Sequence, residues 1–142
     1  MPALLISLFA LAGDPLSKEA VKELESLKGE WVLERLDANG QMNEIKPDDR
    51  PVITINGTTW KITKNDNPIL VALIDPTTQP KLIDLKTPDG DDKHTLREGI
   101  YRIEGDALHI CLFVGGGRER PAGFEKAGSE ETVLAVLRRK KD

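Results

Sequence analysis

The side chains in this sequence that are best suited to chemistry are few. His109 and Cys111 lie two residues apart in a predicted strand, so they point to the same side and could share a metal ion. Zinc usually takes three or four protein ligands, and the only other histidine, His94, falls in a predicted loop. We therefore expect no metal at this pair, and we expect Cys111 to be a small buried residue under an N-terminal helix.

Two loops contain groups that bind ions in other proteins. The run Asp89-Gly90-Asp91-Asp92 supplies three carboxylates, but its spacing is not that of an EF-hand calcium loop, so we interpret it as a solvated turn. The run Gly115-Gly116-Gly117-Arg118-Glu119-Arg120 could bind an anion through backbone N–H groups, but it lacks the Lys-Ser/Thr pair of a P-loop. We expect a flexible loop there. It begins the longest connection, 115–131, and long loops on rigid scaffolds commonly carry function.

No set of residues in the sequence identifies a reaction. None of the serines lies in a G-x-S-x-G elbow, and only two histidines are present to act as a base. The many carboxylates include no pair that the spacing singles out for acid–base catalysis. We therefore expect a protein that is not an enzyme and that uses no cofactor.

The composition indicates one globular domain, which we place at 13–142. A hydrophobic fraction of 39%, with glycine added, matches ordinary globular domains and excludes disorder. A single cysteine excludes an internal disulfide. The net charge of −4 argues against a nucleic-acid partner, although the chain ends in the short basic run Arg138–Lys141.

The first twelve residues, MPALLISLFALA, are uncharged and end in a small-x-small pattern typical of a signal-peptidase site. The run is too short to span a bilayer as a helix, so we expect no membrane span. Three interpretations remain open: a signal peptide read from a start codon placed too late, a short working signal, or a strand or helix packed on the domain. We favour export to the periplasm or outside the cell; without cleavage the protein would be cytoplasmic.

The hydrophobic periodicity predicts one helix followed only by strands. Asp14 and Pro15 form a typical helix start, apolar residues then recur at helical spacing, and Gly29 ends the pattern. After Gly29 the period changes to two. The predicted strands are Glu30–Asp37, Val52–Asn56, Thr58–Thr63, Ile69–Ile74, Lys81–Lys86, Thr95–Glu104, Ala107–Val114 and Thr132–Arg139. Short turns without helical crossovers predict an all-β, eight-stranded antiparallel up-and-down barrel with an N-terminal amphipathic helix.

Hairpin geometry sorts the two faces of the strands. A turn at Asn56-Gly57 would place Ile55 opposite Thr58 and Ile53 opposite Trp60. A turn at Gly105-Asp106 would place Ile103 opposite Leu108. In the first strand, simple alternation puts Trp31, Leu33 and Arg35 on one face and Val32, Glu34 and Leu36 on the other. In the sixth and seventh strands, Arg102, Glu104, His109 and Cys111 are predicted to face outward.

The inner face contains the candidate binding residues. Trp60, Tyr101, Ile103 and Ile110 could form the wall of a site for a small, largely apolar molecule, with Trp60 and Tyr101 each offering a polar atom. The same residues could equally be plain core. We therefore keep two hypotheses: a small-molecule binding module, and a non-enzymatic interaction or structural domain of the cell envelope whose barrel is filled by side chains.

The run Leu27-Lys28-Gly29-Glu30-Trp31 resembles the G-x-W motif at the start of the first strand in lipocalin-type barrels. Arg139 resembles the arginine that packs across that tryptophan, which implies that Trp31 and Arg139 close one end of the barrel.

A wider set of stretches is similar to a family of small, mostly exported, lipocalin-like domains of unknown function that is abundant in planctomycetes. The resemblance covers about residues 20–140 and departs from the family at the N-terminus, where the expected signal looks truncated. It implies a fold and export, and it implies no catalytic residues. The stretches are Glu23–Trp31, Pro80–Leu85, Gly99–Cys111, Arg120–Phe124 with Gly128-Ser129, and Leu134–Arg139.

Overall fold

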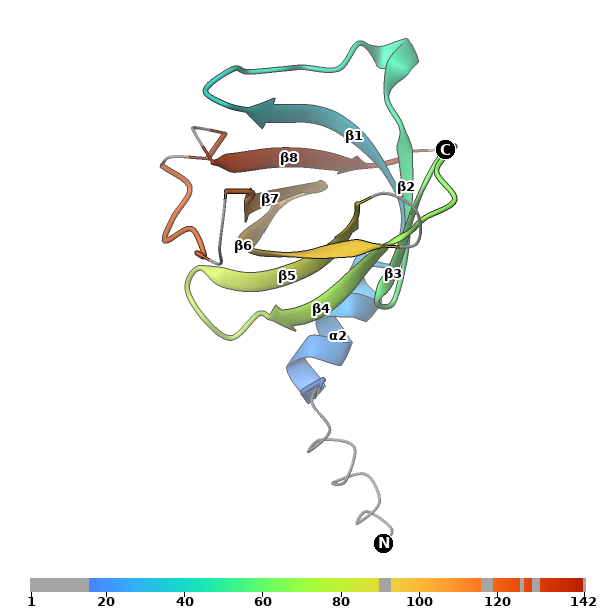
Figure 1. Cartoon of the computed structure of the whole chain (residues 1–142). Coiled ribbons are helices and arrows are strands. Elements are labelled where there is room, and N and C mark those ends of the chain that lie inside the picture. Colours follow the sequence, from blue (N-terminus) through green and yellow to red (C-terminus); the bar gives the residue numbers. More distant parts are fainter. Residues whose placement is uncertain (1–15, 90–92, 116–118, 126, 129–130, 142) are drawn as a thin grey trace, which may run out of the picture.

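The computed structural model describes residues 16–141 apart from 90–92, 116–118, 126 and 129–130. Eight antiparallel strands form a closed barrel in which each strand pairs with its sequence neighbours and the first pairs with the last (Figure 1). This confirms the predicted fold class. The strands are β1 (Gly29–Ala38), β2 (Val52–Asn56), β3 (Thr59–Ile62), β4 (Ile69–Asp75), β5 (Lys81–Pro88), β6 (His94–Glu104), β7 (Ala107–Phe113) and β8 (Thr132–Arg139).

The two predicted hairpin turns differ in outcome. Between β6 and β7, Gly105 has a φ of 61° and Ile103 lies opposite Leu108, so the predicted register is confirmed. Between β2 and β3, Asn56 pairs with Thr59 and the positive φ of 63° is at Gly57, so the predicted turn is wrong by one residue. Each residue of β2 therefore pairs with a residue of β3 two positions farther along the chain than predicted. Because side chains alternate with a period of two, they stay on their predicted faces. The inner face of this hairpin holds Ile53, Ile55, Trp60 and Ile62.

Two β-bulges change which residues point inward. In β1, Leu33 pairs with Leu137 but Arg35 pairs with Val136, so one extra residue lies between them. The prediction that Arg35 shares the inner face with Trp31 is therefore wrong: Arg35 lies outside, where its Nη2 is 2.7 Å from Asp37. A second register shift falls between Val71 and Leu73 in β4.

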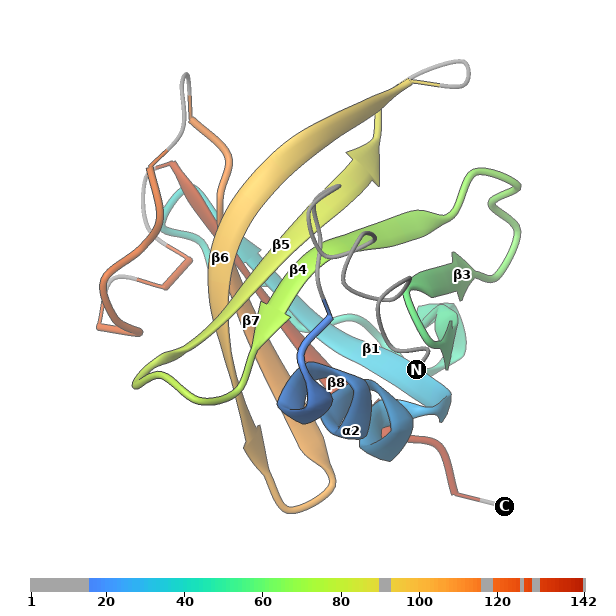
Figure 2. The ribbon, with the colours of Figure 1, turned by 90° about the horizontal axis from the view of Figure 1, so that it is seen from below.

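The helix α2 (Lys18–Leu27) lies across one end of the barrel (Figure 2). Its N-cap is Ser17, whose hydroxyl accepts a hydrogen bond from the Ala20 N–H. The predicted helix start at Asp14-Pro15 lies outside the described residues. We call the barrel end covered by α2 the α2 end, and the opposite end, where β5 stops and β6 begins, the far end.

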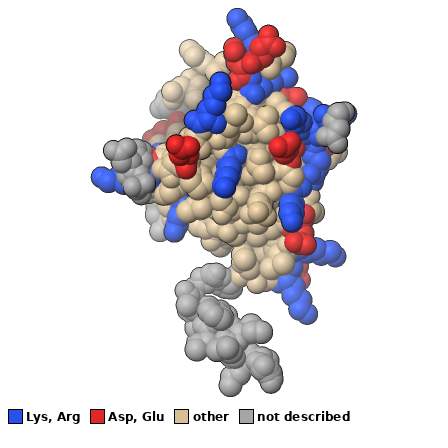
Figure 3. All heavy atoms as spheres, turned by 90° about the vertical axis from the view of Figure 1, so that its right-hand side faces the viewer, with Lys and Arg blue, Asp and Glu red and all other residues tan. Residues whose placement is uncertain are grey.

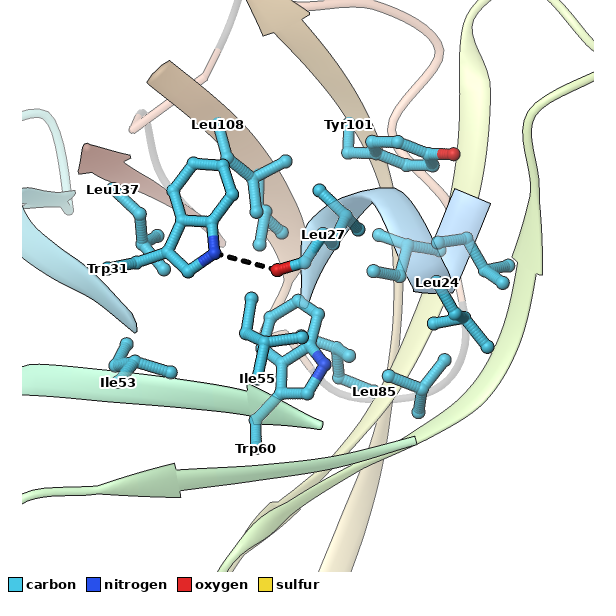
Figure 4. Packing of buried hydrophobic residues seen from close by; sticks show 14 of the residues in the cluster. Leu24, Leu27, Trp31, Ile53, Ile55, Trp60, Leu85, Tyr101, Leu108 and Leu137 are labelled. Atoms are coloured by element: carbon cyan, nitrogen blue, oxygen red, sulfur yellow. Dashed lines mark hydrogen bonds between the residues drawn. The ribbon is translucent and has the colours of Figure 1, made fainter. Parts of the chain in front are cut away.

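The hydrophobic core fills the α2 end. Ala20, Leu24 and Leu27 form the buried face of α2 and join one cluster with buried side chains of the strands. Figure 4 shows Leu24 and Leu27 pointing into the barrel toward the aromatic rings of the core. The largest fully buried side chains of this cluster are Trp31, Trp60 and Tyr101.

The C-terminal end of α2 is held by two side chains of the barrel. The Trp31 indole donates to the Leu27 carbonyl at 2.9 Å (Figure 4). Arg139 donates to the carbonyls of Ser26 and Lys28, and its guanidinium carbon lies 4.4 Å from the centre of the Trp31 ring. The contact between Arg139 and Trp31 that the resemblance implies is thus present, and it also satisfies carbonyls that a helix end leaves free.

Gly29 connects α2 to β1 with a φ of +131°, a region that side-chain-bearing residues rarely adopt. A Cβ at this position would also approach the Arg139 guanidinium. Glycine is therefore required where the helix turns into the first strand. Among the described residues, no helix is both long enough and apolar enough to cross a bilayer.

The contacts of Arg139 at the C-terminal end of α2, which we call the clamp, lead to the first prediction. Replacing Arg139 with Ala should lower the free energy of unfolding by about 1 to 3 kcal/mol, because it removes a cation–π contact and two hydrogen bonds from a charged donor. The control is Arg138→Ala, the neighbouring residue, whose ion pairs to Glu34 and Asp106 are exposed. Urea unfolding of both variants measures the difference, and equal losses would show that the clamp contributes nothing beyond surface charge.

Candidate functional site

The structure places the predicted ligand-binding residues in the packed half of the barrel. Tyr101 and Ile110 are direct neighbours across β6 and β7, and both are buried. Trp60 is buried on β3 in the same cluster, while Ile103 lies near the turn after β6 and is only partly buried. Three of the four residues therefore contribute to the core beneath α2.

Tyr101 already has a polar partner. Its hydroxyl donates to Glu23 Oε2 on α2 at 2.6 Å, and Lys81 Nζ lies 3.4 Å from the same oxygen. Burial raises the pKa of Tyr101 well above its ordinary value of 10.0, and the hydrogen bond to Glu23 raises this pKa further. This cluster anchors α2 to β5 and β6 and leaves the hydroxyl committed to the fold.

Trp60 differs from Tyr101 because its polar atom has no partner. The Trp60 side chain is 1% exposed, and its indole N–H is buried without a hydrogen bond. Leaving a buried donor unsatisfied costs about 1 to 3 kcal/mol. Among the described core side chains, the Trp60 indole is thus a buried donor without an acceptor.

Toward the far end, inward-facing side chains become progressively more exposed. On each of five strands, the last buried residue of the inner face is followed, in the direction of the far end, by an apolar inner-face residue that is only partly buried. Farther along β1, beyond the bulge, Leu36 is 39% exposed. We name these five partly buried residues the far-end ring, and each of them keeps some contact with solvent. It consists of Leu33, Ile62, Ile69, Leu112 and Ala135.

One charged side chain shares the inner face near this ring. Arg97 pairs directly with Leu85, a buried member of the core, so both side chains lie on the inner face of the sheet. The sequence interpretation missed Arg97, although it has the same parity as Tyr101 along β6. The alternation along β6 predicts that Arg97 points inward, but the inner face was predicted from apolar residues alone.

The outer face of the barrel is covered by residues 119–128, described apart from 126. Arg120 reaches across β5 and β6, with Nη1 at 2.6 Å from Asp84 Oδ1 and 2.8 Å from the Gly99 carbonyl. The Arg102 guanidinium lies 4.6 Å from the centre of the Phe124 ring. These contacts bury Asp84, an acid on the outer face of β5.

Cys111 is buried, as expected, but not under α2. It lies on the outer face of β7, where the Gly128 N–H donates to its sulfur. The predicted position beneath the helix is wrong because α2 crosses the end of the barrel and not its side. An open pocket of about 350 Å³ lies beside Cys111, lined also by Phe113, Arg120 and Glu131. Among the described lining residues, the one basic side chain is Arg120, and it is bonded to Asp84.

The two residues considered for metal binding have separate surroundings. His109 Nε2 lies 3.5 Å from Glu104 Oε1, while Cys111 lies beneath residues 119–128. Burial lowers the pKa of His109, and the charge of Arg102 acts in the same direction. Within the described part of the chain, no group of three side chains is arranged to hold a metal ion.

The two loops considered for ion binding are described only in part. Asp89 accepts a hydrogen bond from the Thr95 hydroxyl at 2.8 Å, while residues 90–92 lie outside the described part. Residues 116–118 of the glycine run also lie outside the described part. Arg120, at the end of that run, is bonded to Asp84. The Asp89 and Arg120 contacts both tie these loops to the barrel.

Charge on the surface is mixed in sign. Arg138 bridges Glu34 and Asp106 across neighbouring strands. Figure 3 shows one face of the molecule, on which acidic and basic side chains are interspersed with uncharged surface.

Comparisons with known proteins do not assign the chain to a family. No family model matches the chain, and neither the curated proteins nor the solved structures contain a match.

Tyr101 is the only tyrosine in the chain, so its titration can be followed by tyrosinate absorbance. Because its pKa is raised in the folded state, the native protein should show no ionisation as the pH rises through 10.0, and stability should fall there as the unfolded chain ionises. Tyrosinate should appear only together with unfolding. In Glu23→Gln the pKa should move down toward 10.0 but stay above it, because burial remains. A reversible native titration near 10.0 would contradict the buried Glu23–Tyr101 contact.

Cys111 should be inert in the native protein. Burial raises the pKa of its thiol to about 11, against a weaker opposing hydrogen bond from Gly128. At a pH of about 8, roughly a thousandth of such thiols are ionised. A disulfide reagent such as Ellman's reagent should therefore react with unfolded but not folded protein. Ala122→Cys, which adds an exposed thiol, is the positive control, and prompt native reaction of Cys111 would show that residues 119–128 do not cover it.

Proposed function

We propose that this protein is a non-catalytic, lipocalin-like binding module that takes up a small, largely apolar molecule at the far end of its barrel. One observation carries the proposal: the far-end ring is apolar and inward-facing, yet only partly buried, whereas the described inner-face apolar residues of the α2 end are buried apart from Ile103. Covering this ring with an apolar ligand would gain about 25 cal/mol for each Å² removed from water.

The unpartnered indole of Trp60 supports the same proposal. Ile69, a member of the far-end ring, lies directly opposite Trp60 across β3 and β4. A ligand that carried an additional oxygen atom on the part that reaches past Ile69 could accept a hydrogen bond from the Trp60 N–H. That contact would recover the free energy lost by leaving a buried donor unsatisfied.

The location and kinship of the protein belong to the same proposal. Residues 1–12, the candidate signal, lie outside the described residues, and export rests on their sequence pattern alone. Membership of the small exported lipocalin-like family rests on the quoted stretches. The Trp31–Arg139 contact supports this kinship because the resemblance requires the two residues to meet.

A second candidate function is an interaction domain of the cell envelope without a small ligand. The observation that favours it is the dense packing of Trp31, Trp60 and Tyr101 with α2, which fills the α2 end with side chains. Binding would then use the outer surface, for example the pocket beside Cys111. A barrel that takes up no small apolar molecule would leave this candidate in place.

The test of the first candidate uses two probes of equal chain length, 1-dodecanol and dodecanoate, followed by tryptophan fluorescence and calorimetry. At least one probe should bind with one-to-one stoichiometry. Ile69→Gln should raise its Kd about tenfold, which corresponds to about 1.4 kcal/mol of lost apolar contact.

The matched control is Leu73→Gln on the same strand, because Leu73 faces outward and is 39% exposed. This variant should leave the Kd unchanged, and circular dichroism should show both variants folded. If neither probe binds to the wild-type protein, or if both variants weaken binding equally, the proposed site is wrong.

A further inference from the structure

The inner face of the barrel contains three cationic side chains, counted over the strands as described: Lys81, Arg97 and Arg139. Lys81 and Arg139 lie at the α2 end, where each has partners in the fold. Lys81 pairs with Glu23, and Arg139 stacks on Trp31. Arg97 is the only one of the three toward the far end.

Among the described residues, Arg97 has one hydrogen-bond partner, and that contact is weak. Its Nη1 lies 3.4 Å from the Val114 carbonyl, a long contact at the end of β7. No carboxylate among the described residues forms an ion pair with it. The acid beside it in sequence, Glu98, is on the opposite face, across from Asp84. A guanidinium has five N–H donors in a planar fork, so the described residues use only a small part of its capacity.

The position of Arg97 beside apolar side chains strengthens its attraction for an anion. It pairs with Leu85 across β5 and β6, and it is half-buried on the same inner face as Leu112. Attraction between opposite charges grows as water is excluded from around them. A guanidinium next to a partly exposed apolar ring matches a molecule with an anionic head and an apolar tail.

We propose that the ligand of this barrel is a single-chain amphiphile with a carboxylate headgroup, whose head pairs with Arg97 while its tail lies against the far-end ring. This inference rests on the proposed function, since it assigns the chemistry of the molecule bound at the same end. The two oxygens of a carboxylate match the fork of a guanidinium, which favours paired hydrogen bonds.

The test compares dodecanoate with 1-dodecanol, which share a chain and differ in the charge of the head. At neutral pH the wild-type protein should bind dodecanoate about 10- to 100-fold more tightly. The advantage should shrink as salt is added, because Arg97 is partly exposed. In Arg97→Gln the two Kd values should become equal, with the Kd of dodecanol unchanged.

The matched control is Arg102→Gln, which removes a cation from the outer face of the same strand and should leave the preference intact. Arg97→Lys, which keeps the charge without the planar fork, should retain only part of the preference. Circular dichroism establishes that each variant is folded.

The possible failures are distinguishable. If both probes bind wild-type protein equally, the carboxylate assignment is wrong and the binding module stands. If the preference for dodecanoate survives in Arg97→Gln, Arg97 is not the group that recognises the head. If neither probe binds, the proposed function fails, and the headgroup assignment fails with it.

Discussion

The organisation of this protein depends on how the C-terminal end of α2 is fixed to the barrel. A helix end leaves carbonyls without partners, and here those of Ser26, Leu27 and Lys28 are satisfied by the side chains of Trp31 and Arg139. Trp31 is on the first strand and Arg139 on the last. The same contacts therefore join the two strands that close the barrel and hold the helix across its end.

Once α2 is fixed there, the two ends of the barrel differ. Leu24 and Leu27 enter the α2 end and complete a core around Trp31 and Trp60, so that end is filled by side chains. The other helix of the described residues is the single 3-10 turn η1 (Pro47–Asp49) between β1 and β2, and it has no buried residue, so it adds nothing to the core. The segment 119–128, described apart from 126, is anchored to the outer face of the barrel by the contact of Arg120 with Asp84. The described inner-face apolar residues of the α2 end are thus buried apart from Ile103, whereas those of the far-end ring are only partly buried.

The elements and their faces could be predicted from the sequence because they follow from periodicity, which a strand expresses along its whole length. Local irregularities could not. The bulge before Arg35 inserts one residue without a distinctive sequence and reverses the faces beyond it. The turn at Gly57 tolerates two registers, and only the pairing of whole strands decides between them. The burial of Cys111 beneath residues 119–128 depends on where a long loop returns, which strand pattern does not determine.

The incomplete burial of the far-end ring is a feature of this sequence and not a limit of the fold. The chain fills the α2 end with large side chains, which shows that a barrel of this size can be packed solid. At the far end Ala135 and Leu112 are only partly buried, and the inner face also carries Arg97, whose described contact is a long one to the Val114 carbonyl. Leaving apolar area wet and a guanidinium underused both reduce stability. Under the proposed function, a ligand bound at the far end would offset both costs.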